Sequence, residues 1–362
     1  MSKQNSKNNM DKIRHQFLVK LINEPGPSGF EDNVQNIYRN EVKPYCDEIT
    51  TDSNGNVVAT LNPGKDFSIM ISGHADEIGL IVNYIDENGF IYVKSIGGID
   101  PSILGSKRAR ILTGSGIIEG IFGQKSLHLE EGYKRKIPKM SEVYIDVGAK
   151  NKKDIEKLIS VGDPIIFGEN YRDLMNGYAS ARCFDNRIGV FIITEVLKTL
   201  KNRKLNITVH AVSTVQEETG IFGAGIIAYR LKPTMGIAID AMPATDSPGI
   251  SKTEFGDIKL NNGPVIRRGV KTSNRIAEKL IEVAKSKKIK YQIDIDTGNF
   301  GTDSDAISKV RSGVPVGGLE VPTRYLHSSE ELLSLNDLDN CIKLLSEAIL
   351  SIDKNKNFLD RI

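Results

Sequence analysis

The sequence lacks, or is poor in, several residue types, and each absence narrows what the protein can be. Among 362 residues there is no tryptophan, and there are only 3 cysteines and 5 histidines. Without tryptophan the chain lacks the largest aromatic surface on which a sugar could stack, so a carbohydrate substrate is poorly supported. Cys46, Cys183 and Cys341 are far apart and odd in number, which fits a reducing cytoplasm rather than a disulfide framework. None has Cys-x-x-Cys spacing, which argues against a cysteine-ligated metal.

Excess charge and long apolar runs are also missing. Lys and Arg number 48 against 46 Asp and Glu, a formal net charge of +2. Nucleic-acid binding normally needs a clustered basic excess, so no nucleic-acid partner is predicted. No stretch approaches the roughly 18 consecutive apolar residues of a membrane span, so no membrane association is predicted. Residues 1–9 contain no apolar core of a secretory signal and are interpreted as a polar tail. We therefore expect a cytoplasmic location.

The chain is long enough for two domains. After Asp185, apolar residues at helical spacing alternate with short apolar runs, which favours a three-layer α/β/α domain with a mixed, largely parallel sheet. The predicted helices span 11–23, 31–42, 186–201, 224–231, 273–287 and 336–352, and the predicted strands span 67–72, 207–215, 235–239, 291–295 and 314–321.

A segment with a different pattern of apolar residues interrupts this alternation between about 78 and 170. Short β-rich runs at 80–84, 90–93 and 143–147 are separated by glycine-containing turns, and one helical stretch is expected at 152–159. Many short strands with such turns are typical of a small barrel or sandwich. We therefore predict an inserted, barrel-like β-domain over 77–172, with the main domain formed by 1–76 and 173–362.

Histidines and carboxylates follow several of the predicted strands. Ligands of open α/β sheets bind at the carboxyl ends of strands. Residues of this kind fall at strand ends, before the helix at 186–201 or downstream of the strand at 314–321: His74, Asp185, Glu217, Glu218, Asp240 and His327. Mixed imidazole and carboxylate ligands suit Zn²⁺, Co²⁺ or Mn²⁺ better than Ca²⁺, which prefers oxygen.

Each of these residues alone has a simpler explanation. Asp185 could cap the helix that follows it, and Asp240 could be a cap or a turn residue. His74 could be an ordinary loop histidine, although Asp76 is placed to orient it as ligating imidazoles usually require. His327 could be a lone exposed side chain.

The adjacent pair Glu217–Glu218 is harder to explain without a cation. Two neighbouring carboxylates at the end of an apolar strand repel each other unless positive charge is near. Successive strand residues point in opposite directions. One glutamate could therefore hold a metal while its neighbour faces the substrate as a general base.

An ordered series of motifs extends these observations over nearly the whole chain. They are PGPSGFE at 25–31, GHADEIG at 73–79, DNRIG at 185–189, VQEETG at 215–220, AID at 238–240, RSGVP at 311–315 and PTRYLHS at 322–328. In these motifs the sequence resembles the M42 family of metallo-aminopeptidases, glutamyl- and leucyl-aminopeptidase-like enzymes that form tetrahedral assemblies.

The resemblance implies a role for each site residue. Asp185 would bridge two divalent ions (Zn, Co or Mn); His74 and Asp240 would complete one ion, and Glu218 and His327 the other. Glu217 would be the general acid/base, and Asp76 would orient His74. The resemblance also implies that the inserted domain drives dimerisation and that dimers build a hollow dodecamer. The loop at 298–303 differs from a more glycine-rich form common in the family, and its candidate substrate-binding residues are Gly301, Thr302 and Asp303.

The charges of this ligand set are mutually consistent. Two divalent ions bring +4 and the ligands Asp185, Glu218 and Asp240 bring −3, so a bridging hydroxide would neutralise the remainder. The expected function is therefore a dinuclear-metal aminopeptidase that removes N-terminal residues from peptides, with Glu217 as general base. Two alternatives stay open: an amidohydrolase acting on N-acyl amino acids or other amides, and a non-catalytic scaffold. A scaffold would predict a broken ligand set, whereas all these residues are present.

Overall fold

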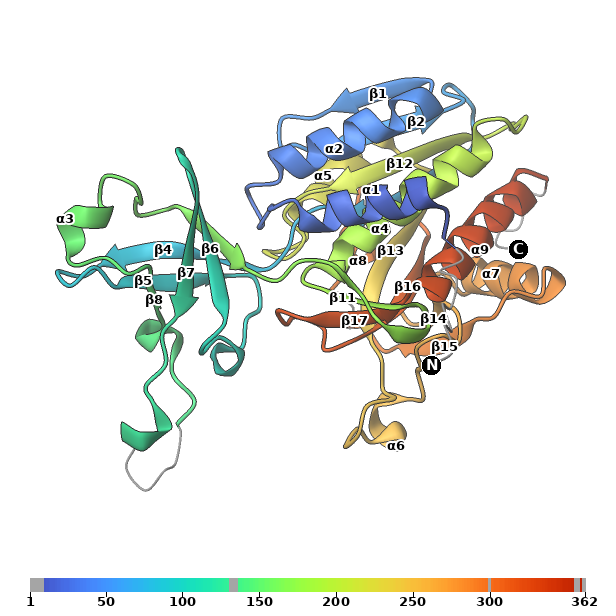
Figure 1. The fold of residues 1–362 in the computed structure, drawn as a ribbon. Coiled ribbons are helices and arrows are strands. Elements are labelled where there is room, and N and C mark those ends of the chain that lie inside the picture. The colour runs from blue at the N-terminus through green and yellow to red at the C-terminus, as the bar shows by residue number, and fades with distance from the viewer. Residues whose placement is uncertain (1–9, 130–135, 299–300, 355–358, 360–362) are drawn as a thin grey trace.

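The computed structural model describes residues 10–129, 136–298, 301–354 and 359, so the expected polar tail at 1–9 lies outside the described residues. The chain forms an α/β domain around an eleven-stranded sheet and a closed six-stranded barrel, which lies at the left of Figure 1. The barrel is inserted between the third and tenth strands in chain order. The predicted fold class is thus confirmed.

The large sheet has a parallel centre with antiparallel additions. β12, β3, β13 and β16 run parallel as neighbours in that order. The other strands join antiparallel, except that β14 and β15 pair in parallel. Bounds in chain order are β1 Glu48–Thr51, β2 Val57–Leu61, β3 Ser68–His74, β10 Arg172–Asp173, β11 Tyr178–Ala181, β12 Thr208–Thr214, β13 Met235–Pro243, β14 Val265–Gly269, β15 Gln292–Asp296, β16 Val316–Arg324 and β17 Glu331–Ser334.

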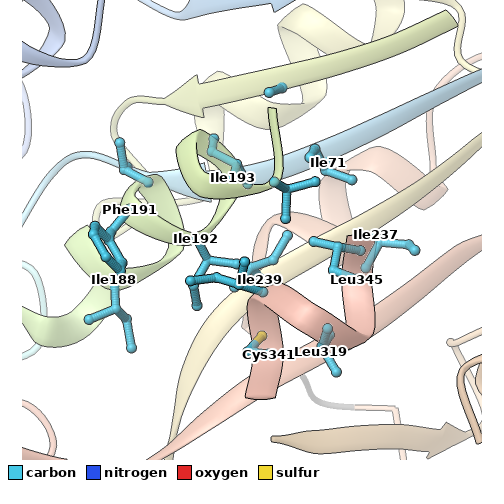
Figure 2. Close-up of a cluster of buried hydrophobic side chains, with 14 of the residues drawn as sticks. Ile71, Ile188, Phe191, Ile192, Ile193, Ile237, Ile239, Leu319, Cys341 and Leu345 are labelled. Atoms are coloured by element: carbon cyan, nitrogen blue, oxygen red, sulfur yellow. The ribbon is translucent and has the colours of Figure 1, made fainter. Parts of the chain in front are cut away.

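Helices cover both faces of this sheet. The helix bounds are α1 Lys12–Asn23, α2 Asp32–Val42, α4 Phe184–Leu200, α5 Phe222–Leu231, α7 Asn274–Ser286, α8 Asp303–Ser308 and α9 Leu335–Lys354, with short α3 at Lys152–Ile155 and α6 at Lys252–Phe255. Alternate residues of β3 point to opposite faces: Ile71 packs with α4 and α9, and Met70 packs with α5 and α8. Figure 2 shows the first of these cores, to which α4 contributes Phe191, β13 contributes Ile237 and α9 contributes Leu345.

One close contact brings the start of α4 to the end of β3. A Cβ atom on Gly73 would lie 2.4 Å from the backbone carbon of Gly189, so only glycine allows this approach. Because α4 begins directly beside the carboxyl end of β3, Asp185 is brought next to His74.

The inserted barrel has its own apolar core. Its strands are β4 Gly79–Ile85, β5 Ile91–Ile96, β6 Arg108–Thr113, β7 Gly116–Phe122, β8 Tyr144–Asp146 and β9 Pro164–Phe167, closed in the order β4-β5-β8-β7-β6-β9. The helix expected over 152–159 is shorter, because α3 ends at Ile155. Among the described residues, no helix is long and apolar enough to cross a bilayer. Cys46, Cys183 and Cys341 are free thiols, and the cytoplasmic location stays a prediction.

A buried ion cluster holds the start of the barrel to the main domain. Glu77, two residues before β4, accepts from Arg182 Nε at 2.9 Å and from Arg187 Nη2 at 3.2 Å. The backbone N–H of Gly26 donates to the same carboxylate at 3.1 Å. Both arginines are at most 1% exposed, so their charges depend on this one glutamate and on backbone carbonyls.

Replacing Glu77 with alanine is expected to destabilise the protein strongly. Removing one partner of a buried ion cluster leaves uncompensated charge and costs about 3–5 kcal/mol. Urea unfolding of Glu77→Ala should show a clearly lower midpoint than wild type. The exposed pair of Glu87 with Lys152 provides the control, since Glu87→Ala should change stability by less than about 1 kcal/mol. Equal midpoints for the two variants would contradict this role of Glu77.

Candidate functional site

The predicted site residues lie together at the carboxyl end of the parallel strands. His74 is the last residue of β3. Asp240 lies inside β13 rather than after it, because pairing with β16 continues as far as Pro243. The expectation that Asp240 closes a strand, or sits in a turn, was therefore wrong. His327 lies in the connection between β16 and β17.

Glu217 and Glu218 lie on a loop rather than at the end of a strand. β12 ends at Thr214, and Gln216 has a left-handed backbone with φ 57°. The argument from strand alternation therefore does not hold. The two carboxylates are nevertheless separated: Glu217 Oε2 lies 3.8 Å from His74 Nε2, and Glu218 Oε2 lies 3.5 Å from His327 Nε2.

Asp185 faces both histidines at once. Its Oδ1 lies 3.2 Å from His74 Nε2, and its Oδ2 lies 3.3 Å from His327 Nε2. Asp185 does not cap the helix; Asn186 does so, because its Oδ1 accepts from the N–H of Gly189 at 3.0 Å. The Asp185 carboxylate therefore stays free for the site.

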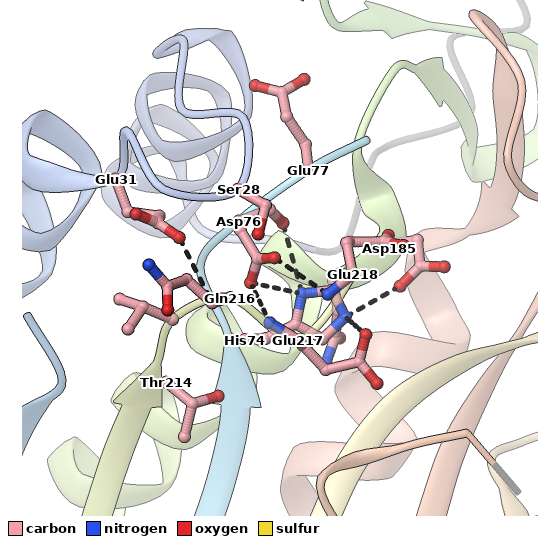
Figure 3. Close-up of polar contacts among 12 residues, drawn as sticks. Ser28, Glu31, His74, Asp76, Glu77, Asp185, Thr214, Gln216, Glu217 and Glu218 are labelled. Carbon is pink, nitrogen blue, oxygen red and sulfur yellow. Dashed lines mark hydrogen bonds and ion pairs between the residues drawn. The ribbon is translucent and has the colours of Figure 1, made fainter. Parts of the chain in front are cut away.

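In the part of the chain that the structure describes, the ligand-type atoms fall into three overlapping groups, each with all atoms within 4.8 Å of one another. The groups are His74 with Asp185 and Asp240; His74 with Glu217 and Glu218; and Asp185 with Glu218 and His327. His74, Asp185 and Glu218 each belong to two of these groups. Among them, Asp185 has one carboxylate oxygen facing each histidine, so it would suit a ligand shared by two ions. Figure 3 shows Asp185, Glu217 and Glu218 around the imidazole of His74.

The electrostatics of the cluster fit bound cations. Burial raises the pKa of Glu217 to about 9, and burial together with the charge of Asp185 holds the pKa of Glu218 and of Asp240 well above the usual range. The Oε1 atom of Glu217 is buried and has no hydrogen-bond partner. Such crowding of buried carboxylates is unfavourable without positive charge, and divalent ions would supply it.

Two further carboxylates, those of Asp76 and Glu331, contact residues of the cluster. Asp76 Oδ1 lies 3.3 Å from His74 Nδ1, close enough for the expected orienting role, which stays a prediction. Glu331 accepts from the backbone N–H of Asp185 at 3.0 Å and from that of His327 at 3.2 Å. Sequence reasoning missed Glu331, because its contact with Asp185 crosses 146 positions of the chain and no local pattern marks it.

The barrel also reaches the site. His327 Nδ1 lies 3.1 Å from the carbonyl oxygen of Gly98, in the loop after β5. A Cβ atom on Gly98 would lie 3.4 Å from this ring nitrogen, in van der Waals contact with it. The imidazole of His327 is thereby oriented by a part of the chain that belongs to the inserted domain.

A cavity of about 440 Å³ opens over the cluster. Beyond the site residues, its wall includes the apolar Ile221, Met242 and Leu326 and the charged Arg267 and Glu320. Arg267 Nε lies 3.3 Å from Glu320 Oε1, so the two charges face each other in the wall. None of these five was expected to line a cavity. Leu326 lies in the PTRYLHS motif, and no local motif marks the other four.

The three candidate substrate-binding residues are placed differently from one another. Gly301 and Thr302 line the cavity, whereas buried Asp303 accepts from Thr214 Oγ1 at 2.8 Å. The preceding positions 299 and 300 of the loop at 298–303 lie outside the described residues. Substrate binding by this loop stays a prediction.

Known proteins match this chain over most of its length. The profile of the M42 glutamyl aminopeptidase family matches residues 55–344. A lysyl aminopeptidase of Pyrococcus furiosus is 31% identical over 349 residues, covering 95% of this chain and 98% of the relative.

Solved structures extend the similarity to the whole fold. The TET aminopeptidase of the marine sediment archaeon Thaumarchaeota archaeon SCGC AB-539-E09 superposes with a TM-score of 0.89 at 32% identity, covering 93% of this chain and 96% of that one. TET1 peptidase of Pyrococcus horikoshii, which can assemble into a tetrahedron or a large octahedral shell, has a TM-score of 0.83 at 31% identity, covering 92% of this chain and 98% of its own. The chain therefore belongs to the M42 glutamyl aminopeptidase family, whose members are metallo-aminopeptidases.

Proposed function

We propose that this chain is a dinuclear-metal aminopeptidase that removes N-terminal residues from peptides. The observation that supports this most directly is the position of Asp185, whose two oxygens face two different histidines. The remaining ligands divide around it, with Asp240 beside His74 and Glu218 beside His327. Two Zn²⁺, Co²⁺ or Mn²⁺ ions suit this set of imidazole and carboxylate donors.

The metal ions and the side chains would have different roles in the reaction. When bound, a pair of divalent ions supplies Lewis-acid polarisation of the scissile carbonyl and makes a bound water more acidic. Glu217 takes the proton of the attacking water and returns it to the leaving amine. Its unpartnered Oε1, buried beside the cavity, is available for that proton. Asp76 keeps His74 oriented through Nδ1.

The cavity would receive the first side chain of the peptide. It has apolar walls at Ile221 and Met242 and a charged pair at Arg267 and Glu320. The relatives differ in the residue named, since the family is called glutamyl and the Pyrococcus furiosus relative lysyl. We propose that Thr302 and its neighbours contribute to selection.

We further propose a homo-oligomer in which the domain at 77–172 forms dimers, with dimers building a dodecamer. The main domain at 1–76 and 173–362 would then carry the catalytic site. Apolar side chains on β7 support a role of the barrel in association: Ile117 is 48% exposed and Ile121 is 56% exposed. TET1 peptidase of Pyrococcus horikoshii, which has a similar fold, can assemble into a tetrahedron or a large octahedral shell.

An aminoacyl anilide panel tests the proposed activity. Protein loaded with Zn²⁺, Co²⁺ or Mn²⁺ is expected to hydrolyse some of the leucine, glutamate and lysine anilides and to leave the N-acetylated forms intact. A chelator should abolish the turnover, and added metal should restore it. Preference for the acetylated forms would support the amidohydrolase alternative, and no turnover of any substrate by metal-loaded protein would support a scaffold.

A further inference from the structure

The loop between α1 and α2 carries the PGPSGFE motif but contributes no residue to the site described above. It packs against the loop that bears Glu217 and Glu218. Ser28 and Glu31 are each only 6% exposed. A carboxylate is buried at a cost unless hydrogen bonds compensate it, so the partners of Glu31 indicate what this burial serves.

Glu31 bonds to the neighbouring loop instead of to its own helix. It directly precedes α2 but makes no side-chain capping bond there. Its Oε1 accepts from the N–H of Gly29 at 2.8 Å. The same oxygen accepts from the N–H of Gln216 at 3.0 Å, a contact drawn in Figure 3. The contact with Gln216 joins positions 185 residues apart, so it is a tertiary tie and not a local turn.

Three successive backbone N–H groups of that loop donate hydrogen bonds to buried carboxylates. The N–H of Gln216 donates to Glu31, while those of Glu217 and Glu218 donate to Asp76 at 3.1 and 3.0 Å. Successive amides of this kind form a concavity that favours anions. The left-handed conformation of Gln216 costs on the order of 1–3 kcal/mol and persists only when surrounding contacts enforce it.

A second contact joins the same two loops at Thr219, directly after the two glutamates. Ser28 Oγ lies 2.9 Å from Thr219 Oγ1, and the N–H of Ser28 donates to the carbonyl of Glu77 at 3.1 Å. The loop at 25–31 therefore spans the segment after His74 and the segment after Glu218. It fixes these two segments relative to each other.

The side chain of Glu217 gains little from its own contacts. Its Oε1 has no hydrogen-bond partner, and its Oε2 lies 3.8 Å from His74. Its position is thus set mainly by its backbone. We propose that Glu31 is a positioning residue, which holds the Gln216 N–H and thereby places the Glu217 carboxylate for proton transfer, with Ser28 as a second contact. This inference rests on the proposed aminopeptidase function.

Three variants of the full-length, metal-loaded protein test this role. Glu31→Ala removes the acceptor, Glu31→Gln keeps an oxygen that can accept the same N–H groups, and Asp32→Ala removes an exposed neighbouring acid. Glu31→Ala is expected to lower kcat by about 10- to 100-fold, since small displacements at a reacting centre have effects of this size. KM and the content of two metals should stay near wild type. Glu31→Gln should recover most of the loss, and Asp32→Ala should match wild type.

Several results would overturn the proposal. These are an unchanged kcat in Glu31→Ala, a loss of metal in step with activity, or a Glu31→Gln variant as impaired as Glu31→Ala. If Glu31→Ala does not fold, Glu31→Asp, which retracts the oxygens by one methylene, takes its place against Glu31→Gln.

Amide hydrogen exchange separates this proposal from the proposed function. If wild type hydrolyses no aminoacyl anilide, the aminopeptidase assignment fails, but exchange of the segment at 214–221 still tests the tie. Faster exchange there in Glu31→Ala than in Glu31→Gln supports it. Equal exchange in both variants and in wild type contradicts it.

Discussion

Replacing Glu217 with glutamine is expected to leave both metal ions bound and to lower kcat by about 10²–10⁴-fold, the usual contribution of a general base. Glutamine keeps the size of the side chain but cannot take a proton. Glu217 lines the cavity and has one buried oxygen without a hydrogen-bond partner, whereas the two ligand groups that contain Asp185 do not include Glu217. Steady-state kinetics on the best aminoacyl anilide, with metal content measured on the same sample, provide the test.

The neighbouring glutamate provides the matched control for this prediction. Glu218→Gln makes the same chemical change one position away, but Glu218 lies 3.5 Å from His327 Nε2 and belongs with Asp185 and His327 to a ligand group that does not contain Glu217. It is expected to lose metal as well as activity. If Glu217→Gln keeps full turnover with two ions bound, the general-base assignment fails.

Replacing Asp185 with asparagine is expected to reduce the metal content from two ions to at most one and to abolish turnover. The amide offers a single oxygen donor and removes one negative charge, so it cannot face both His74 and His327 with oxygens as the carboxylate does. Because ligand binding stabilises the folded state, added Zn²⁺ should also raise the unfolding temperature of Asp185→Asn less than that of wild type.

Two histidine variants test whether the loss of metal is specific to the candidate ligands. His327→Ala should lose the ion shared with Glu218 and keep the other. His128→Ala, an exposed position in the inserted domain, should keep both ions. Metal analysis after gel filtration distinguishes these outcomes, and two ions retained in both Asp185→Asn and His327→Ala would contradict the assigned ligands.

Much of the fold could be predicted because apolar residues recur at helix or strand spacing within each element. The helix expected at 11–23 is observed as α1, and the strand expected at 235–239 is the first part of β13. The strands at Glu48–Thr51 and Val57–Leu61 were missed. β1 is short, and only one of its residues is even partly buried, so it carries little apolar pattern. Its place in the sheet depends on pairing with β2.

Some residues of the candidate site could likewise be proposed from the sequence, and others could not. The candidate ligands could be proposed from their places near predicted strand ends together with the family resemblance, and the structure brings them close to one another. Their roles as ligands stay predictions. The supporting groups could not be proposed in this way, since Glu331, Gly98 and Glu31 act through contacts between segments far apart in the chain. The path of the Glu217 loop could not be predicted either, because it depends on a left-handed residue that is not glycine.

The contact between His327 and Gly98 means that the barrel is not an exchangeable module. A chimera carrying the barrel of a relative would also receive a foreign loop against the imidazole of His327. Since groups that orient a metal-ligating histidine commonly change metal affinity by about 10- to 100-fold, the metal affinity of such a chimera should depend on the donor of the barrel. Divergence of the inserted domain could in this way alter metal use without changing a single ligand.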